Sequence, residues 1–240
     1  MQLIGLLIIA GIVVYGFSER GDTQVSAFDL HALVMVLGGS LGAVLVRSAP
    51  ATALRTFVAL RELVPGLGVY AAATRAMEGE REQLVTAWRE GRKAQAMEVA
   101  SQSRFQSIKD MAQLILERAG ASESHQTYQA IRHDEIGTWQ PPINNWEMLS
   151  KLGPSFGMVG TITGMVQMFR NMSAENMNIG ASMSLALLAT LYGVAFGAGI
   201  AGPIGHFLND LLDERLGVYD RCEASVNALV AGSRSFRETA

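Results

Sequence analysis

The sequence predicts an all-α membrane protein, in which four transmembrane helices form two hairpins and a helical cytoplasmic domain lies between spans 2 and 3. Two observations predict this class. First, stretches 3–17, 30–46, 152–169 and 179–208 are nearly free of charged residues, and a membrane-spanning helix needs about 20 largely apolar residues. Second, 49% of the residues are hydrophobic and the mean hydropathy is +0.22, which is high for a soluble protein. A large soluble helical bundle is the alternative, but buried soluble helices rarely run so long without a charge.

The first hairpin is predicted from stretches 3–17 and 30–46. The first stretch is short, so a secretory signal peptide is the alternative. Its start, MQLIGLL, lacks a basic n-region, and no A-x-A-like cleavage site follows. We therefore predict a true span. The second stretch has spanning length if it begins near Ala27 and tolerates Asp29 and His31 at its end.

The region between the hairpins is predicted to be helical. Stretches 53–64, 77–100 and 103–120 place apolar residues three and four positions apart, the period of an amphipathic helix. No stretch alternates apolar and polar residues as a strand would.

Two aromatic residues and a proline pair precede the third apolar stretch. The adjacent Pro141 and Pro142 are predicted to break any incoming helix, because proline lacks the backbone N–H. Trp139 and Trp146 are predicted to lie at the membrane–water interface, where aromatic residues gather.

The second hairpin is predicted from stretches 152–169 and 179–208, which are rich in small residues. Membrane helices associate by close packing, and small residues let two backbones approach. Three pairs have the GxxxG spacing: Gly153 with Gly157, Gly160 with Gly164, and Gly193 with Gly197.

The distribution of Lys and Arg predicts the orientation. Thirteen of the 19 lie from Arg47 to Lys151 and four follow the last span, whereas only Arg20 and Arg170 lie in the two short connections. Basic residues favour the cytoplasmic side, so both termini are predicted to be cytoplasmic.

The predicted domains are a first transmembrane hairpin at 1–46, a cytoplasmic helical region at 47–148, a second transmembrane hairpin at 149–208 and a cytoplasmic C-terminal tail at 209–240.

Thr161 and Thr190 are the candidate polar groups inside the second hairpin. A membrane threonine often bonds only its own i−4 carbonyl, and this alternative stays open for each one. Two threonines at similar depth in adjacent helices instead indicate a polar lining for an ion. Such a pathway normally needs a carboxylate at membrane depth, and the predicted spans contain none there. The acid is therefore expected from another polypeptide.

LGPSFGMVGTITGMV and ALLATLYGVAFGAGIAGPIG resemble the paired third and fourth membrane helices of the MotA/TolQ/ExbB proton-channel superfamily. Within it, two N-terminal spans before a cytoplasmic block resemble the MotA-type (MotA/PomA-like) flagellar motor stator subunits. The segment VLGGSLGAVLVRSAP is similar to their second span. TolQ and ExbB proteins have a single N-terminal span.

The resemblance implies roles for particular residues. Pro154 and Pro203 match family prolines and imply helix kinks that couple ion binding to movement. Thr190 matches the fourth-helix threonine. Thr161 matches a position that tends to be Thr in sodium-driven stators and Ala in proton-driven ones, although TolQ and ExbB types resemble this pattern and carry protons, so the ion stays open.

The resemblance also implies a whole machine. It implies a non-enzymatic, ion-conducting stator subunit of the bacterial inner membrane, which carries H⁺ or Na⁺, needs no cofactor and turns ion flow into torque. Five copies would surround a MotB-like (PomB/ExbD-like) single-span partner that supplies the membrane aspartate. The stretch WREGRKAQAME resembles the rotor-docking motif through Arg89, Gly91 and Glu98, with altered spacing.

Two rival functions stay open at this stage. One is a TolQ/ExbB-like energiser of another envelope or gliding machine. The other is a polytopic membrane enzyme or metal transporter that uses the polar residues His125, His133, Asp134 and Glu135. These four lack zinc-ligand spacing, so no metal site is predicted. The sequence has no P-loop or nucleophile elbow, and its net charge of −3 gives no push toward nucleic acid. The one cysteine, Cys222, excludes an internal disulfide.

Overall fold

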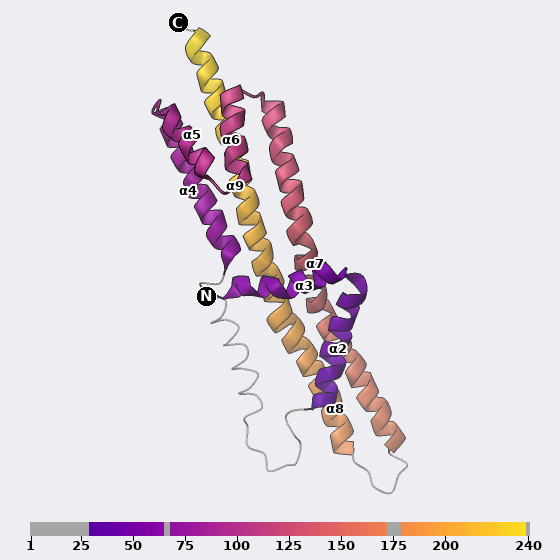
Figure 1. Ribbon diagram of the computed structural model, residues 1–240. Coiled ribbons are helices and arrows are strands. Elements are labelled where there is room, and N and C mark those ends of the chain that lie inside the picture. Colours follow the sequence, from indigo (N-terminus) through magenta and orange to yellow (C-terminus); the bar gives the residue numbers. More distant parts are fainter. Residues whose placement is uncertain (1–28, 65–67, 172–178, 239–240) are drawn as a thin grey trace. The chain divides into compact units, whose positions relative to one another are not determined.

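The structure is a computed structural model that describes residues 29–64, 68–171 and 179–238. The described chain is entirely helical, as predicted (Figure 1). Its elements are α2 (Leu30–Arg47), α3 (Pro50–Val58), the 3₁₀-helix η1 (Ala59–Leu63), α4 (Val69–Arg89), α5 (Lys93–Gln102), α6 (Gln106–Glu117), α7 (Ala121–Asn171), α8 (Ile179–Val194), the π-helix η2 (Ala195–Ala201) and α9 (Gly202–Glu238). The predicted first span at 3–17 lies outside the described residues.

The chain divides into two compact units. The first unit contains the chain up to Val64 together with Pro141–Leu208, and the second contains Pro65–Gln140 together with Asn209–Ala240. These boundaries differ from the predicted domains. Residues 47–64 and 141–148 belong to the same unit as the predicted hairpins. The residues predicted as the C-terminal tail belong to the second unit.

Helix α2 begins at an N-cap and ends at a basic residue. The Asp29 carboxylate accepts hydrogen bonds from the backbone N–H groups of His31 (2.8 Å) and Ala32 (3.3 Å). Such a cap satisfies donors that have no partner inside the helix. Arg47 occupies the last turn, where a cation complements the helix dipole. The stretch predicted as the second span is therefore one continuous helix.

Two helical stretches of the described chain are long and apolar enough to cross a membrane: Leu30–Arg47 and Ser182–Gly232. The first contains the predicted second span, and the second contains residues 182–208 of the predicted fourth span. The predicted third span at 152–169 forms the end of α7 but is not one of these two stretches. Its glycines, threonines and glutamine lower its mean hydropathy. The arrangement of four spans in two hairpins therefore stays a prediction.

The prediction that Pro141 and Pro142 break the incoming helix is wrong. Helix α7 runs for 51 residues through both prolines and through Pro154. An interior proline costs about 3 kcal/mol or more. Burial of a large apolar side chain contributes about 1.5–3 kcal/mol, and Ile143 and Leu149 are fully buried just beyond the pair. Burial of this segment therefore offsets part of the local cost of its prolines.

The two tryptophans expected at a membrane interface pack inside the units. Trp146 is buried in the first unit, and its indole N–H donates to the backbone oxygen of Thr56 at 3.0 Å. Trp139 is half-buried in the second unit, with its ring centroid 4.3 Å from that of Tyr70. Each of the two side chains therefore contacts residues of its own unit.

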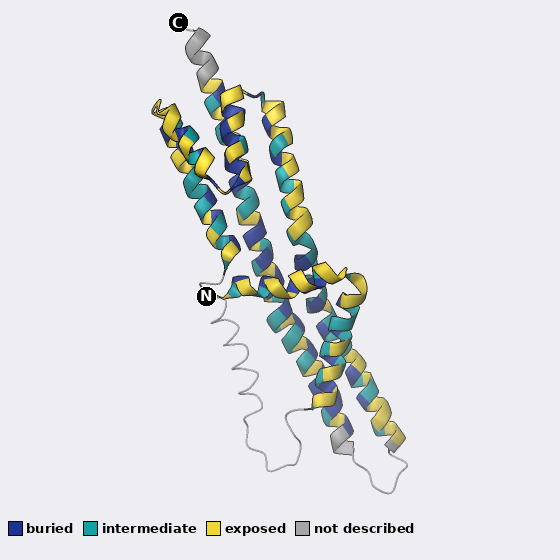
Figure 2. Ribbon diagram, viewed as in Figure 1, coloured by how far each residue is buried: buried dark blue, intermediate teal, exposed yellow. Residues whose placement is uncertain are grey.

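The core of the second unit joins α4, α5 and α6 to the parts of α7 and α9 that belong to that unit. Figure 2 shows buried faces along each of these helices. Tyr128 of α7 is fully buried there, and its hydroxyl donates to the backbone oxygen of Ser107 at 2.9 Å. The other large side chains of this core that are fully buried are Met77, Leu84, Ile108, Met111 and Val218.

Candidate functional site

The contact between α7 and α8 is made by glycines. A Cβ atom on Gly153 would lie 2.7 Å from the Gly193 backbone oxygen, and one on Gly193 would lie 2.5 Å from the Gly153 oxygen. Farther along, Gly157 faces Ala189 and Gly164 faces Ser182 and Ala186, so the helices run antiparallel. Larger residues would separate the backbones. The glycines therefore determine which residues of the two helices meet.

Thr161 and Thr190 meet in this register. Their hydroxyl groups hydrogen-bond each other. The Thr161 Oγ1 atom also lies 3.1 Å from the Gly157 oxygen of its own helix and 3.2 Å from the Ala186 oxygen of α8. Thr190 Oγ1 lies 3.4 Å from the same Ala186 oxygen. Each hydroxyl therefore lies within hydrogen-bonding distance of its own i−4 carbonyl, and the two also form a joint polar cluster.

Both hydroxyl hydrogens of this cluster are already donated in hydrogen bonds within it. Each hydroxyl has one hydrogen to donate and two lone pairs to accept with. Because the hydroxyls bond each other, one hydrogen lies between them, and the other is directed to a carbonyl of Gly157 or Ala186. Three of the four lone pairs remain. The cluster thus offers acceptors, which suit a cation, a water molecule or the O–H of a protonated carboxylic acid.

The pair opens onto an apolar surface of the chain. Thr190 is exposed, and Leu187, which is 62% exposed, lies one turn before it on α8. On α7, Ile162 is 59% exposed beside half-buried Thr161. The other exposed large apolar side chains are Met158, Val159, Met165, Val166 and Phe169 in the 152–169 stretch of α7, and Met183, Leu191 and Val194 on α8. A hydroxyl pair within an apolar stripe is typical of a surface that another helix covers.

Pro154 lies against the π-helix η2. A Cβ atom on Gly197 would lie 2.5 Å from the Pro154 Cδ atom and 2.6 Å from the backbone oxygen of Ser150. In an α-helix the N–H of residue 154 would bond the oxygen of residue 150, but proline has no N–H. The Ser150 carbonyl that Pro154 leaves free therefore faces the backbone of η2.

Pro203 lies two residues after the end of η2, in the first turn of α9. The Gly202 N–H donates to the Gly197 oxygen, five residues back, which is the π pattern. A proline clashes with the carbonyl four residues before it. The wider π turn lies just before Pro203, where such a clash would otherwise occur. Single π turns occur frequently at functional sites. The two prolines predicted as kinks therefore both border one irregular segment, which the sequence did not predict.

Arg89 and Glu98 lie on two different helices of the second unit. Arg89 ends α4, Glu98 lies in α5, and both side chains are exposed. Gly91 makes the turn between the helices with a φ of +77°, which glycine adopts without strain. Glu98 accepts a bond from the Gln102 Nε2 atom at 3.2 Å. No hydrogen bond or ion pair joins Arg89 to Glu98 among the described residues.

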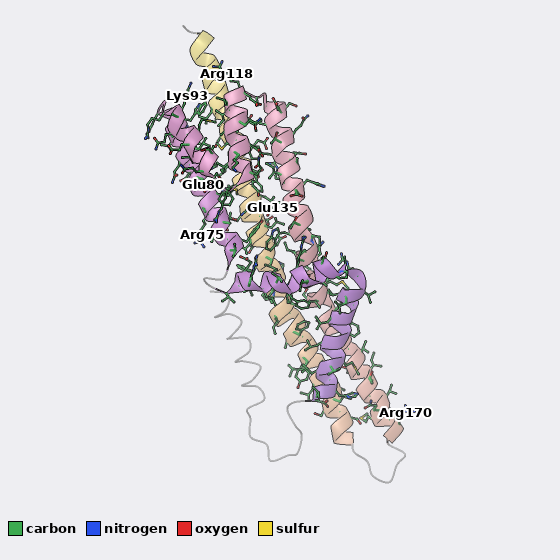
Figure 3. The ribbon with its side chains drawn as sticks, viewed as in Figure 1. Arg75, Glu80, Lys93, Arg118, Glu135 and Arg170 are labelled. Atoms are coloured by element: carbon green, nitrogen blue, oxygen red, sulfur yellow. The ribbon has the colours of Figure 1, made fainter. Side chains whose placement is uncertain are left out.

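Glu135 and His125, two of the residues considered for a metal site, form other bonds. The Glu135 carboxylate accepts hydrogen bonds from the hydroxyls of Tyr70 (2.7 Å) and Tyr219 (2.9 Å), and it is labelled in Figure 3. His125 Nδ1 lies 2.9 Å from a Glu223 carboxylate oxygen. Within the described part of the chain, no three His, Cys, Asp or Glu side chains gather to hold a metal.

The Glu135 cluster continues to Arg215, which contacts both the Tyr219 hydroxyl and Thr74 Oγ1 at 3.2 Å. Burial raises the pKa of Tyr219 to about 12 and raises that of Tyr70. Sequence reasoning missed this cluster, because 65 and 84 residues separate Glu135 from its two tyrosines. No local pattern marks such a pair.

Comparison with known proteins gives consistent matches. The profile of the MotA/TolQ/ExbB proton channel family matches residues 93–220. "Motility protein A" of Aquifex aeolicus is 40% identical over 68 residues, which are 28% of this chain and 26% of that protein. "Motility protein A" of Cereibacter sphaeroides is 49% identical over 73 residues, 30% of this chain and 26% of that protein. The matched segments thus span about a quarter of the length of these curated relatives.

Two solved structures share the fold. The flagellar MotAB stator complex of Bacillus subtilis matches with a TM-score of 0.73 and 16% identity, covering 96% of this chain and 89% of that one. MotAB of C. jejuni matches with a TM-score of 0.69 and 15% identity, covering 95% and 89%. The family profile covers more than half of the chain and includes both threonines and both prolines. This chain therefore belongs to the MotA/TolQ/ExbB proton channel family.

Proposed function

We propose that this chain is the ion-conducting stator subunit of a flagellar motor. The observation that carries the proposal is the Thr161–Thr190 hydroxyl pair, which opens onto an apolar surface of α7 and α8. The Motility protein A relatives and the MotAB structures support this choice within the family. A TolQ/ExbB-like role in another envelope machine is not favoured, because the named relatives are motility proteins.

The chemistry of the pair suits an ion pathway that lacks its own acid. The remaining lone pairs can coordinate Na⁺, hold water or accept the proton of a carboxylic acid. The apolar parts of α7 and α8 contain no Asp or Glu at the depth of the threonines. A charged group at membrane depth is costly unless it is paired or solvated. A MotB-like (PomB/ExbD-like) single-span partner would therefore bring the aspartate, and the threonines would solvate the ion beside it.

The assembly would be a ring of five copies around this partner, in the bacterial inner membrane. The exposed apolar faces of α7 and α8 would be covered by the partner helix and by a neighbouring copy. Four spans would leave both termini in the cytoplasm. The chain would do no enzymatic chemistry and need no cofactor. The ion that passes through the complex would be H⁺ or Na⁺.

Movement would begin where the threonine pair lies beside the irregular helical segment η2. Pro154 and Pro203 border η2, so a change at the threonines has a deformable segment beside it. Arg89 and Glu98 are exposed on the α4–α5 hairpin of the second unit, where a rotor protein could dock by electrostatic complementarity.

The testing experiment measures ion flux through the complex reconstituted in vesicles with its partner. The variant is Thr161→Ala combined with Thr190→Val, which removes both hydroxyls. The matched control is Thr163→Val, because among the described residues Thr163 Oγ1 bonds only the Val159 oxygen of its own helix, at 2.9 Å. We expect the double variant to lose flux while the partner still co-purifies, and the control to conduct normally. Unchanged flux in the double variant would contradict the proposal.

A further inference from the structure

The short helix α3 presents an exposed apolar face just after α2 ends. Leu54, Phe57 and Val58 are spaced three and four residues apart, so they share one side of the helix. All three are exposed, with Leu54 at 67%. Ala53 and Thr56 are buried on the other side. Figure 2 shows the exposed positions along α3. A soluble surface would not be expected to gather its apolar side chains in this way.

Three hydrogen bonds fix α3 against α7 within the first unit. The Thr56 backbone oxygen accepts from the Trp146 indole N–H at 3.0 Å, and Thr56 Oγ1 accepts from Asn145 Nδ2 at 2.9 Å. Just before α3, the Ser48 hydroxyl donates to Asn145 Oδ1 at 2.9 Å. The Phe57 ring also packs edge-on to Trp146, with 6.4 Å between centroids. Figure 1 shows α3 crossing α7 where these bonds lie. The direction of the exposed face is therefore set.

This anchoring sets the level of α3 relative to the predicted membrane span. Trp146 lies six residues before the apolar stretch that begins at Leu152. At a rise of 1.5 Å per residue, the separation along α7 is about 9 Å. The headgroup layer on each side of a bilayer is roughly 5–8 Å thick. Trp146 would therefore lie just outside this layer. Because a helix with its side chains is about 10–12 Å across, α3 held at this level would overlap the lipid headgroups.

Two arginines accompany the apolar face without a protein partner for their charge. Arg47 ends α2 and Arg55 lies in α3; both are exposed, and neither forms an ion pair with any described residue. Helix α3 itself contains no acidic residue. Arg61 differs, because it lies 3.4 Å from the Glu62 carboxylate. Arginine can lay its aliphatic stem on an apolar surface while its guanidinium reaches a polar layer.

We propose that α3 lies in the cytoplasmic headgroup layer and binds anionic lipid. Leu54, Phe57 and Val58 would insert toward the acyl chains, while Arg47 and Arg55 bind lipid phosphate groups. A lipid surface suits this face, because it offers acyl chains to the apolar side chains and phosphate groups to the two arginines at one boundary. The inference rests on the membrane topology of the proposed function and adds a lipid class to it.

The test uses the full chain in bilayers of brominated phosphatidylglycerol or brominated phosphatidylcholine. Bromine quenches tryptophan fluorescence at contact, so Leu54→Trp reports which lipid touches α3, after the signal of the unaltered chain is subtracted. We expect stronger quenching by phosphatidylglycerol. Adding Arg47→Gln and Arg55→Gln should reduce that preference by about fivefold per arginine. The matched control, Arg75→Gln, changes an exposed arginine of α4 and should leave the preference intact.

A second reporter, Val34→Trp on the exposed side of α2, separates this inference from the proposed function. If Val34→Trp is quenched and Leu54→Trp is not, a protein or water covers α3 and the inference is wrong. The predicted membrane topology would still hold in that case. Equal quenching of Leu54→Trp by both lipids also overturns it, as does a preference that survives loss of both arginines. If neither reporter is quenched, the membrane topology itself fails.

Discussion

The hydroxyl of Thr161 hydrogen-bonds the hydroxyl of Thr190 across the contact between α7 and α8. The two residues are 29 positions apart in the chain and meet because facing glycines bring the helix backbones together. One polar cluster therefore depends on two separate features, the hydroxyls and the glycine register, and each can be changed without the other.

Removing the Thr190 hydroxyl alone should reduce ion flux. Thr190→Val nearly preserves the side-chain volume, and a lost membrane hydrogen bond averages only about 0.6 kcal/mol, so the complex should still assemble. A hydrogen bond to a charged group contributes about 1.5–3 kcal/mol, which corresponds to a flux loss of roughly tenfold or more. Vesicle flux with partner co-purification as the control measures this. Full flux would mean that the Thr190 hydroxyl serves only hydrogen bonds within the helix pair and does not line an ion path.

Thr161→Ala should separate the two possible ions. In this variant the Thr190 hydroxyl can still donate to the Ala186 oxygen and keeps two lone pairs. A proton needs only one acceptor or water, so a proton path should conduct nearly as before. A partly dehydrated Na⁺ needs several oxygens, so a sodium path should weaken and lose its sodium dependence. The measurement is flux against sodium concentration at fixed pH. A sodium-dependent path that is unaltered by the change would place the ion elsewhere.

The glycine register should not tolerate a methyl group. In Gly193→Ala the new Cβ would meet the backbone oxygen of Gly153 at 2.5 Å, and backbone cannot move aside as a side chain can. Overpacking costs about 1–3 kcal/mol, so thermal stability should fall. Gly79→Ala is the matched control, since no atom lies within 4 Å of its Cβ position in α4. Alanine is the better helix former by about 1 kcal/mol, so the control should be stabilised. Equal melting temperatures would contradict the assigned register.

The sequence predicted the all-helical class and the candidate ion site. Both depend on features that are visible along one helix: long apolar stretches, small residues at fixed spacing and a threonine in each stretch. The continuity of α7 through Pro141 and Pro142 could not be predicted in this way, because burial of Ile143 and Leu149 competes with the local preference of proline. Helix propensity is a weak prior when tertiary packing competes with it.

Other features depend on partners that are distant in the sequence. Glu135 was considered only as a metal ligand, yet it accepts bonds from tyrosines 65 and 84 residues away. The bond from Trp146 to a residue 90 positions before it could not be predicted either. The π-helix η2 has no signature of its own beyond the proline that follows it. In each case the missing information was which helix lies opposite.

Alkaline pH should test the Glu135 cluster. Burial raises the pKa of Tyr219 to about 12, above the usual value of about 10. A raised pKa favours the protonated form in the folded state, so its stabilisation is complete below pH 10 and disappears as the pH rises through 12. Tyr219→Phe removes this titration along with the bonds to Glu135 and Arg215. The variant should be less stable at pH 8, and the difference from the parent should shrink between pH 10 and 12. Helical signal in thermal melts is the measurement, and a pH-independent difference would contradict the assignment.

Charge reversal on the α4–α5 hairpin should impair torque but not ion flow. Arg89→Glu and Glu98→Lys change exposed side chains that hold no ion pair among the described residues, so folding should be unaffected. Reversal of a surface charge should instead oppose docking with a complementary rotor. Arg75→Glu, elsewhere on α4, is the control. Motility of tethered cells and vesicle flux measure the two effects. If reversal prevents assembly, these residues serve folding.

Pro154 should act through η2. Because Pro154 has no N–H, the Ser150 carbonyl is free of its helical bond and faces Gly197, while the proline ring lies against the same glycine. Pro154→Ala would supply an N–H to the Ser150 carbonyl and remove the ring from η2. The helix should become more stable and straighter. We expect ion-driven work to fall, since the irregular segment would lose the contact that links it to α7.

The control for this change is Pro142→Ala, which also restores a helical hydrogen bond in α7 but lies 12 residues before Pro154. A general effect of helix straightening would appear in both variants, whereas an effect through η2 would appear only in Pro154→Ala. Flux and motility are measured at equal expression, with partner co-purification showing that the complex is intact. If Pro154→Ala works normally, the contact between Pro154 and Gly197 is packing alone. If Pro142→Ala fails equally, stiffness of the whole helix accounts for the loss and η2 has no special part in it.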